Sequence, residues 1–421
     1  MRYYRPSEDW ITNLEGPHRE PFAATLRGLG LERLQKYPPP KLGGLPLGNE
    51  TRILKRYLKG ESSQLDASAL SSFYLRSASA RDKLLYSAFR RNDHLSREQW
   101  ADIIGAERVD KWLRHKFLRE TLSSEGEGKF VCKFSIVVLD GLLMLVDPLN
   151  DHGNQHETVM LPEDFLPAEN DNDVAPFNHT YIGLDSLRQI EIMAESDLPV
   201  SGGNLGSYLD CGVGAGAILL SITKKARGFN ASIGVDINPR AAMLAQFNAE
   251  LNNLTNVRVY GDDALKLGGR YGKFDLVSWN LPFLFFPEEY ADSAVDAFGG
   301  EMGIGLCLDF IETVPGLLTE NGVTCIAALS PILNSGENVL ETKLKERLGR
   351  LRLDCTVRVA QVSLAHNREM WHFHQSHNIR KFESVYLFLR PGGGKLKRIE
   401  AGVTRRALDV IREKMYRRKF S

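Results

Sequence analysis

The chain has 421 residues, with a hydrophobic share of 43% and a charged share of 25%, which are ordinary values for a globular protein of two or three domains. These values exclude a largely disordered, collagen-like or fibrous chain. Lys and Arg together number 53, and so do Asp and Glu, so any attraction to nucleic acid or to an anionic membrane has to come from local patches.

The cysteines and the apolar runs bear on the compartment. The five cysteines are widely spaced and include no Cys-x-x-Cys pair, which argues against a disulfide framework and against a structural zinc site. The first ten residues are polar, and no apolar run approaches the ~20 residues of a membrane helix. We therefore expect a cytoplasmic protein with no membrane partner.

The first part of the sequence predicts an arm followed by helices. The three prolines Pro38–Pro40 cannot continue a helix, so residues 1–65 are expected to form an N-terminal arm, or short helices that pack on another part of the molecule. Apolar residues at helical spacing follow. Ser96 and Gln99 have the spacing of a capping box at the start of one of these helices.

Two apolar runs, 130–139 and 142–146, come after these helices and are expected to form a hairpin. Helices followed by a hairpin predict a winged-helix-like domain over residues 66–150. Such a domain either docks nucleic acid or a peptide, or packs against the next domain. Residues 151–180, which are rich in Asp and Glu, are expected to form an acidic linker or lid.

From residue 181 to 395 the sequence predicts an α/β, Rossmann-like doubly wound domain, because strand and helix patterns alternate. Its first strand, 207–211, leads into Gly212, Gly214 and Gly216. These glycines let the backbone pass closely under a ligand. The segment also satisfies a dinucleotide fingerprint that ends at Ala217, so an NAD(P)-dependent oxidoreductase is one alternative.

Carboxylates follow or end the first three strands. Asp210 lies two residues before the first glycine, where it can meet a positively charged amino-acid moiety and would repel a pyrophosphate. Asp236 ends the second strand and can accept hydrogen bonds from ribose hydroxyls. Asp262 and Asp263 follow the third strand, where a carboxylate can bind an adenine amino group.

The fourth strand ends in the tetrad Asn280, Leu281, Pro282 and Phe283. The side-chain oxygen of Asn280 and the carbonyl of Leu281 can accept the two N–H bonds of a planar nitrogen, which stabilises charge that develops there. Pro282 biases Leu281 toward extended backbone. Phe283 can stack on a flat group.

This order of motifs resembles class I S-adenosylmethionine-dependent methyltransferases. It is most similar to the small-domain group, which includes ribosomal RNA guanine methyltransferases and release-factor glutamine methyltransferases. The resemblance implies a seven-stranded sheet, S-adenosylmethionine as cofactor, no metal, and N-methylation of an RNA, protein or peptide substrate.

The resemblance also implies roles for the single residues. Asp210, Gly212, Gly214 and Gly216 would hold the methionine end of the cofactor, Asp236 the ribose, and Asp262 with Asp263 the adenine, while Asn280 would border the cofactor and orient the nitrogen. Leu281 stands where the family commonly has proline, which keeps open a cofactor-binding module without turnover. Phe283 in the last place mildly favours the RNA enzymes over the glutamine enzymes.

Two features near the C-terminus complete the analysis. His366, His372, His374 and His377 are expected on an active-site rim or surface loop without a metal, because no cysteine or acidic cluster joins them. Residues 396–421 are expected to form a basic helix. From residue 390 onward there are eleven Lys or Arg and three acidic residues, which predicts either a footprint for RNA or an acidic peptide, or a solvated helix.

Overall fold

The computed structural model describes residues 10–14, 16–36, 75, 78–122, 128–147, 180, 182–196, 206–226, 229–293, 296–363 and 368–400. The expected acidic linker, apart from its last residue, and the chain after residue 400 lie outside these ranges. No helix within them is long and apolar enough to cross a bilayer.

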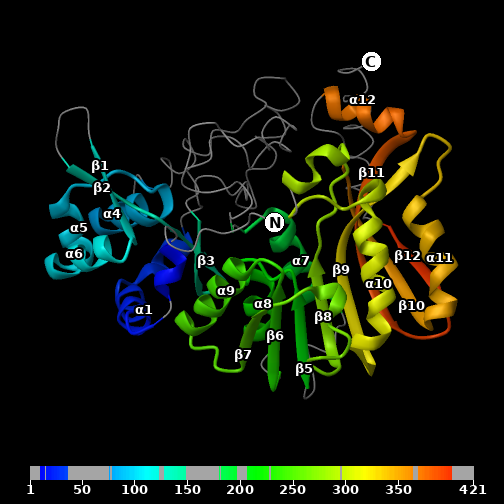
Figure 1. Cartoon of the computed structure of the whole chain (residues 1–421), viewed down its shortest axis with the longest axis horizontal. Helices are drawn as coiled ribbons and strands as arrows, with labels where there is room; N and C mark the ends of the chain where they lie inside the picture. Colours follow the sequence, from blue (N-terminus) through cyan, green and yellow to red (C-terminus); the bar gives the residue numbers. More distant parts are fainter. Residues whose placement is uncertain are drawn as a thin grey trace.

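One eight-stranded sheet organises the C-terminal part of the molecule (Figure 1). Across the sheet the strands are β12 (Leu396–Ile399), β10 (Leu353–Ser363), β11 (Ile379–Pro391), β9 (Leu318–Leu333), β8 (Phe274–Asn280), β5 (Ser207–Cys211), β6 (Ala231–Asp236) and β7 (Val257–Gly261). The five strands from β9 to β7 are parallel, and β11 is antiparallel to both of its neighbours. The predicted α/β doubly wound class is confirmed.

Helices cover both faces of this sheet. On one face lie α7 (Leu184–Glu195), α8 (Ala217–Ala226) and α9 (Pro239–Leu251), and on the other lie α10 (Gly305–Leu317) and α11 (Val339–Leu351). The central strands β5, β8 and β9 are largely buried on both sides, as the inner strands of a covered parallel sheet must be. Tyr208 of β5 packs in the core of the first face, and its neighbour Leu209 packs in the core of the second.

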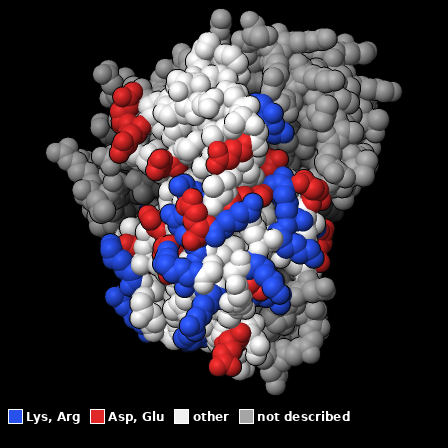
Figure 2. Space-filling model, turned by 90° about the vertical axis from the view of Figure 1, so that its right-hand side faces the viewer, with Lys and Arg blue, Asp and Glu red and all other residues white. Residues whose placement is uncertain are grey.

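Two predictions are wrong at the edge of the sheet: the sheet has eight strands where seven were expected, and the residues from 396 do not begin a helix. Residues 396–399 form β12, an eighth strand parallel to β10. The strand is stabilised from its side chains as well, because Arg398 forms ion pairs with Glu341, Glu383 and Glu400. Figure 2 shows this side of the molecule, where Lys and Arg are interspersed with Asp and Glu.

The N-terminal part contains helices and two hairpins. Its helical elements are η2 (Trp10–Leu14), α1 (Arg19–Gly28), η3 (Leu31–Lys36), α4 (Ala80–Tyr86), the π-helical η4 (Ser87–Arg91), α5 (Arg97–Ile104) and α6 (Ala106–Arg114). The predicted capping box at Ser96 and Gln99 is present at the start of α5. The single strand expected over 130–139 is wrong, because β2 (Gly128–Cys132) pairs with β1 (Leu118–Leu122), and β3 (Ser135–Leu139) pairs with β4 (Leu142–Val146).

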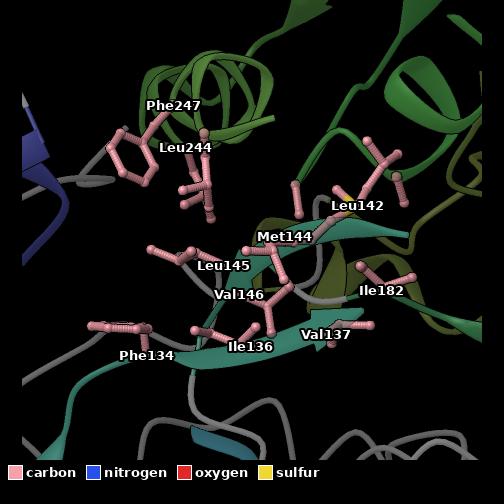
Figure 3. Close-up of a cluster of buried hydrophobic side chains, with 14 of the residues drawn as sticks. Phe134, Ile136, Val137, Leu142, Met144, Leu145, Val146, Ile182, Leu244 and Phe247 are labelled. Carbon is pink, nitrogen blue, oxygen red and sulfur yellow. The ribbon is translucent and has the colours of Figure 1, made fainter. Parts of the chain in front are cut away.

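The hairpin of β3 and β4 packs against α9, and their side chains form one apolar cluster (Figure 3). Met144 and Leu145 of β4 belong to this cluster together with Leu244 and Phe247 of α9. Burial of such side chains contributes roughly 1.5–3 kcal/mol each. The hairpin therefore belongs to the core that the N-terminal part shares with the sheet domain.

Polar contacts also tie β4 to α9. Asn248 accepts a hydrogen bond from the backbone N–H of Leu145 (2.9 Å) and donates one to its carbonyl (3.0 Å). Asn252, one turn later, forms the same pair of bonds with Leu143 (2.8 and 2.7 Å). Two side-chain amides thus satisfy the strand edge in place of a neighbouring strand.

A buried ion pair lies at the end of the same strand. Arg240, in the first turn of α9, contacts Asp147 with both guanidinium ends, at 2.6 and 2.5 Å, and the two side chains are only 1% and 4% exposed. Asp147 also accepts a hydrogen bond from the backbone N–H of Thr180 (2.6 Å).

Candidate functional site

The candidate site lies at the carboxyl ends of β5 and β8, where the order of the strands reverses. In open α/β sheets ligands bind at this point of the topology. Cys211 of β5 is paired with Trp279 of β8. The segments that follow the two strands, the glycine loop and the Asn280 tetrad, therefore begin side by side.

The glycine loop has a backbone that other residues rarely adopt. Gly212, Gly214 and Gly216 have φ values of +59°, +53° and +89°. A Cβ at Gly212 would lie 2.6 Å from the indole Nε1 of Trp279, so the close approach of the two strand ends requires glycine there. A Cβ at Gly214 would meet nothing within 4 Å, so this part of the loop faces open space.

Asp210 lies beneath the loop and is engaged by the protein itself. Its carboxylate accepts hydrogen bonds from the Ser278 hydroxyl (2.5 Å) and from the backbone N–H of Leu219 in α8 (3.1 Å). Removal from water raises the pKa of Asp210 to about 7. The residue braces α8 against β8 and is 1% exposed, so its contact with an amino-acid moiety stays a prediction.

Asp236 ends β6 and faces the same loop. Its carboxylate accepts hydrogen bonds from the backbone N–H groups of Gly214 (2.8 Å) and Asn238 (2.9 Å). Removal from water raises its pKa to about 6. Beside it, Ile237 is 59% exposed, an unusual position for a large apolar side chain and a suitable one for covering a flat ring.

Asp262 and Asp263 lie at the end of β7 and have separate surroundings. Asp262 accepts hydrogen bonds from Tyr271 (2.9 Å) and Arg270. Burial raises the pKa of Asp262, but these two bonds and one from the backbone N–H of Asp263 outweigh it, so the net pKa is lowered. The Asp263 carboxylate instead caps the next turn at Leu265. The contact of these two carboxylates with adenine stays a prediction.

The tetrad begins with an asparagine whose side chain is held from one side only. The amide nitrogen of Asn280 donates hydrogen bonds to Asp185 (2.5 Å) and Ser186 (3.1 Å), which are in the first turn of α7. Its oxygen, Oδ1, is buried and has no hydrogen-bond partner among the described residues. A buried acceptor without a partner is costly, by about 1–3 kcal/mol, and is suited to a ligand that brings a donor.

The other tetrad residues pack on the protein. Leu281 is 1% exposed and belongs to the core under α10, which gives a physical reason for leucine where proline is common. Phe283 is half-buried. A Cβ at Gly299 would lie 2.7 Å from the Cα of Phe283, so the glycine-rich segment after the tetrad supports this residue directly.

Comparisons with known proteins agree with this geometry. A family described as "Methyltransferase domain" matches residues 204–384. A Methanocaldococcus jannaschii protein that carries the name protein N5-glutamine methyltransferase is 37% identical over 142 residues, which are 32% of this chain and 67% of that protein. The chain belongs to the class I S-adenosylmethionine-dependent methyltransferases.

Two further relatives are matched over shorter stretches. A tRNA (guanine(26)-N(2))-dimethyltransferase of Methanococcus aeolicus is 43% identical over 79 residues, 18% of this methyltransferase and 20% of the relative. A release factor glutamine methyltransferase of Aliivibrio fischeri is 33% identical over 100 residues, 24% of this chain and 34% of the relative. The methyltransferase thus spans about a fifth and a third of these two proteins.

The residues at the crevice fit S-adenosylmethionine, the cofactor of this family. The backbone at Gly214 is open to a ligand, Asp236 is a carboxylate at a strand end, and Ile237 is an exposed apolar side chain. The match to a methyltransferase domain favours this cofactor over the dinucleotide of an oxidoreductase.

The histidine-rich segment contacts the chain just after the tetrad. His372 and His374 lie on α12 (Arg368–Ser376), so the loop expected there is partly helical; His366 lies outside the described residues. The His374 ring is 3.0 Å from the carbonyl oxygen of Phe285, two residues after the tetrad. Within the described part of the chain, no group of His, Cys, Asp and Glu is placed to hold a metal ion.

Sequence reasoning missed Asp185, Ser186 and Ile237. An acidic residue in the first turn of a helix is common, and Asp185 is 95 positions from Asn280, so nothing in the sequence connects the two. Ile237 had a signal, because an apolar residue directly after the acid of β6 stands where the strand leaves the core.

Proposed function

We propose that this methyltransferase transfers a methyl group to a planar nitrogen, and that a side-chain amide of a protein or peptide is its first candidate substrate. The observation that carries the proposal is the buried Oδ1 of Asn280 at the end of β8, which has no hydrogen-bond partner in the part of the chain that the structure describes. An acceptor there binds an N–H group, whereas a carboxylate or carbonyl of a substrate would be repelled.

In the proposed mechanism the chain positions the reactants. Asp236, with the open backbone at Gly214 and the flat cover of Ile237, would hold the cofactor, and Asp262 would accept from the adenine amino group. The bound cofactor supplies an electrophilic methyl group on a positively charged sulfur. Asn280 Oδ1 and the Leu281 carbonyl would accept the two N–H bonds of the substrate nitrogen, which fixes its orientation and stabilises the developing charge. The new N–C bond would form as the C–S bond of the cofactor breaks, and the nitrogen would release one proton to water.

Two considerations place a side-chain amide before an RNA base. The longest of the three alignments is with a protein named for glutamine methylation, and the identity there is 37%. The described part of the C-terminal basic surplus includes Arg398, whose charge is balanced by Glu341, Glu383 and Glu400. An exocyclic guanine amine of RNA is the second candidate, because a guanine-N2 enzyme is 43% identical over a shorter segment and Phe283 ends the tetrad.

For residues 80–132 we propose a winged-helix-like unit that helps to capture the substrate. Three features support it: the order α4, α5, α6, the hairpin of β1 and β2, and an isolated antiparallel bridge between Leu95 and Phe130 at the edge of that hairpin. The hairpin of β3 and β4, which was expected to be the wing, packs on α9 instead.

A labelling experiment tests the substrate class. A lysate of cells that lack the gene is incubated with the purified full chain and S-adenosylmethionine that carries a deuterated methyl group. Protein and RNA fractions are then hydrolysed and analysed by mass spectrometry. We expect labelled N-methylglutamine or N-methylasparagine in the protein fraction. Label in N2-methylguanosine would select the second candidate. Label only on oxygen or carbon, or no label from a chain that binds S-adenosylhomocysteine, would overturn the proposal.

The affinity for S-adenosylhomocysteine should fall as the pH falls through about 6. Ribose hydroxyls donate to the charged form of Asp236, whose pKa is raised to about 6, so protonation below that pH removes the acceptor and the affinity rises again with pH. Calorimetry from about pH 5 to about pH 8 measures this. Asp236→Asn should bind more weakly, by roughly 1.5–3 kcal/mol per charge-assisted bond, with a flatter profile. If the affinity of Asp236→Asn kept the pH dependence of the wild type, the titrating group would be Asp210, and Asp236 would not belong to the cofactor site.

A further inference from the structure

Asn280 is oriented by a residue from a distant part of the chain. The amide nitrogen Nδ2 of Asn280 lies 2.5 Å from the carboxylate of Asp185 and 3.1 Å from the hydroxyl of Ser186. Both partners lie in the first turn of α7, which packs against β8 and β9. The carboxylate is favourably placed there, because the positive end of the helix dipole stabilises a negative charge.

The chemistry of this contact leaves one orientation for the amide. An ionised carboxylate only accepts hydrogen bonds, so it binds the NH₂ end of Asn280 and repels the oxygen end. If the amide were rotated by 180°, Oδ1 would face the Asp185 carboxylate, and Nδ2 would take the place that Oδ1 has now. The observed orientation directs the acceptor away from α7, where Oδ1 is buried with no described partner.

We infer that Asp185 is a positioning residue, which fixes Asn280 so that the site presents an acceptor and selects substrates that bring an N–H group. This inference rests on the proposed function of Asn280. A site with a freely rotating amide would present a donor part of the time and would then bind a carbonyl or carboxylate oxygen as well as an N–H group. The Asp185 contact thus keeps the tetrad a hydrogen-bond acceptor toward the substrate, while Ser186 supplies a second, neutral acceptor for the amide nitrogen.

The first test measures turnover in single and double variants of the full chain. Asp185→Ala should lower kcat by about tenfold to a hundredfold, with the affinity for S-adenosylhomocysteine within about twofold of wild type. Asp185→Asn keeps one acceptor oxygen and should recover most of the rate. The pair Asp185→Ala with Asn280→Ala should be no slower than Asn280→Ala alone, because Asp185 acts through Asn280. Arg188→Ala, which removes an exposed ion pair with Glu191 on the same helix, is the matched control and should leave kcat unchanged.

The second test does not depend on turnover. Asn280→Asp places two carboxylates in contact and should lower the midpoint of thermal unfolding, because like charges at this distance repel. Adding Asp185→Asn restores a donor and an acceptor in exchanged positions and should return the midpoint toward that of wild type.

The outcomes separate the inference from the function on which it rests. A wild-type rate in Asp185→Ala, or additive losses in the double alanine variant, would overturn the positioning role and leave the proposed function intact. Absence of any nitrogen methylation by the wild type would overturn the proposed function. In that case the unfolding midpoints would still test the contact between Asp185 and Asn280. If the midpoint did not recover when Asp185→Asn is added to Asn280→Asp, the positioning role of Asp185 would be rejected too.

Discussion

Asn280→Ala should lower kcat by about 10²–10³-fold, equivalent to about 2.7–4 kcal/mol of transition-state stabilisation, and should leave the affinity for S-adenosylhomocysteine within about twofold of wild type. The amide nitrogen of Asn280 is already held by α7, and only its oxygen is available to a substrate. The substitution therefore removes an acceptor that is aimed at the nitrogen, while the contacts of Asp236 with the glycine loop are untouched.

The measurement is single-turnover kinetics on the substrate that the labelling experiment identifies, together with calorimetry of cofactor binding. Asn334→Ala is the matched control, because Asn334 also follows the carboxyl end of a strand, β9, but is exposed and contacts Asn378. A rate within about twofold of wild type for Asn280→Ala, with cofactor still bound, would contradict the planar-nitrogen assignment and leave only cofactor binding.

The burial of Leu281 bears on the substitution Leu281→Pro, which would restore the common tetrad. From the sequence alone, Leu281→Pro should be tolerated if the backbone there is already close to the proline φ. The side chain is 1% exposed and lies in the core beneath α10, so replacement by the smaller proline would also remove buried apolar contacts. Proline at this position would restrict the backbone, whereas Leu281 fills the core beneath α10. The leucine is therefore explained by packing and is no argument for a chain that binds the cofactor without turnover.

The strands and loops of the cofactor site could be predicted because their signals are local. The first strand was expected over residues 207–211 and is found there as β5, since an apolar run that ends at closely spaced glycines has few other structures available. The acid of β6 and the tetrad of β8 were located in the same way. Their common position in the site follows from parallel strands, whose carboxyl ends share one edge of the sheet.

The features that could not be predicted depend on contacts between distant segments. Residues 396–399 are basic and short, and they become a strand only because the edge of β10 accepts them. Asp185 is brought to Asn280 by the packing of α7 on the sheet. Asp210 shows a further limit, because its place in the sequence suggested a ligand contact, whereas its hydrogen bonds to Ser278 and Leu219 give it a bracing role that the sequence does not reveal.

Asp147→Ala should destabilise the protein by about 3–5 kcal/mol, the typical loss when one partner of a buried ion pair is removed. Arg240 is 1% exposed and would keep its charge in a site that no longer holds the Asp147 carboxylate. The backbone N–H of Thr180 would lose its acceptor too. The effect should appear in urea denaturation as a lower midpoint with an unchanged slope.

Two comparisons make this result specific to the buried pair. Asp110→Ala removes an exposed ion pair with Arg97, where the side chains are 59% and 49% exposed, and should change stability by at most about 1 kcal/mol. Asp147→Ala combined with Arg240→Met removes both charges and should recover much of the loss, because the buried charge is then absent.

A loss below about 1 kcal/mol for Asp147→Ala would mean that water reaches Arg240 in solution. In that case the hairpin of β3 and β4 would be held on α9 by its apolar side chains and by Asn248 and Asn252, and the ion pair would contribute little to joining the N-terminal part to the methyltransferase domain.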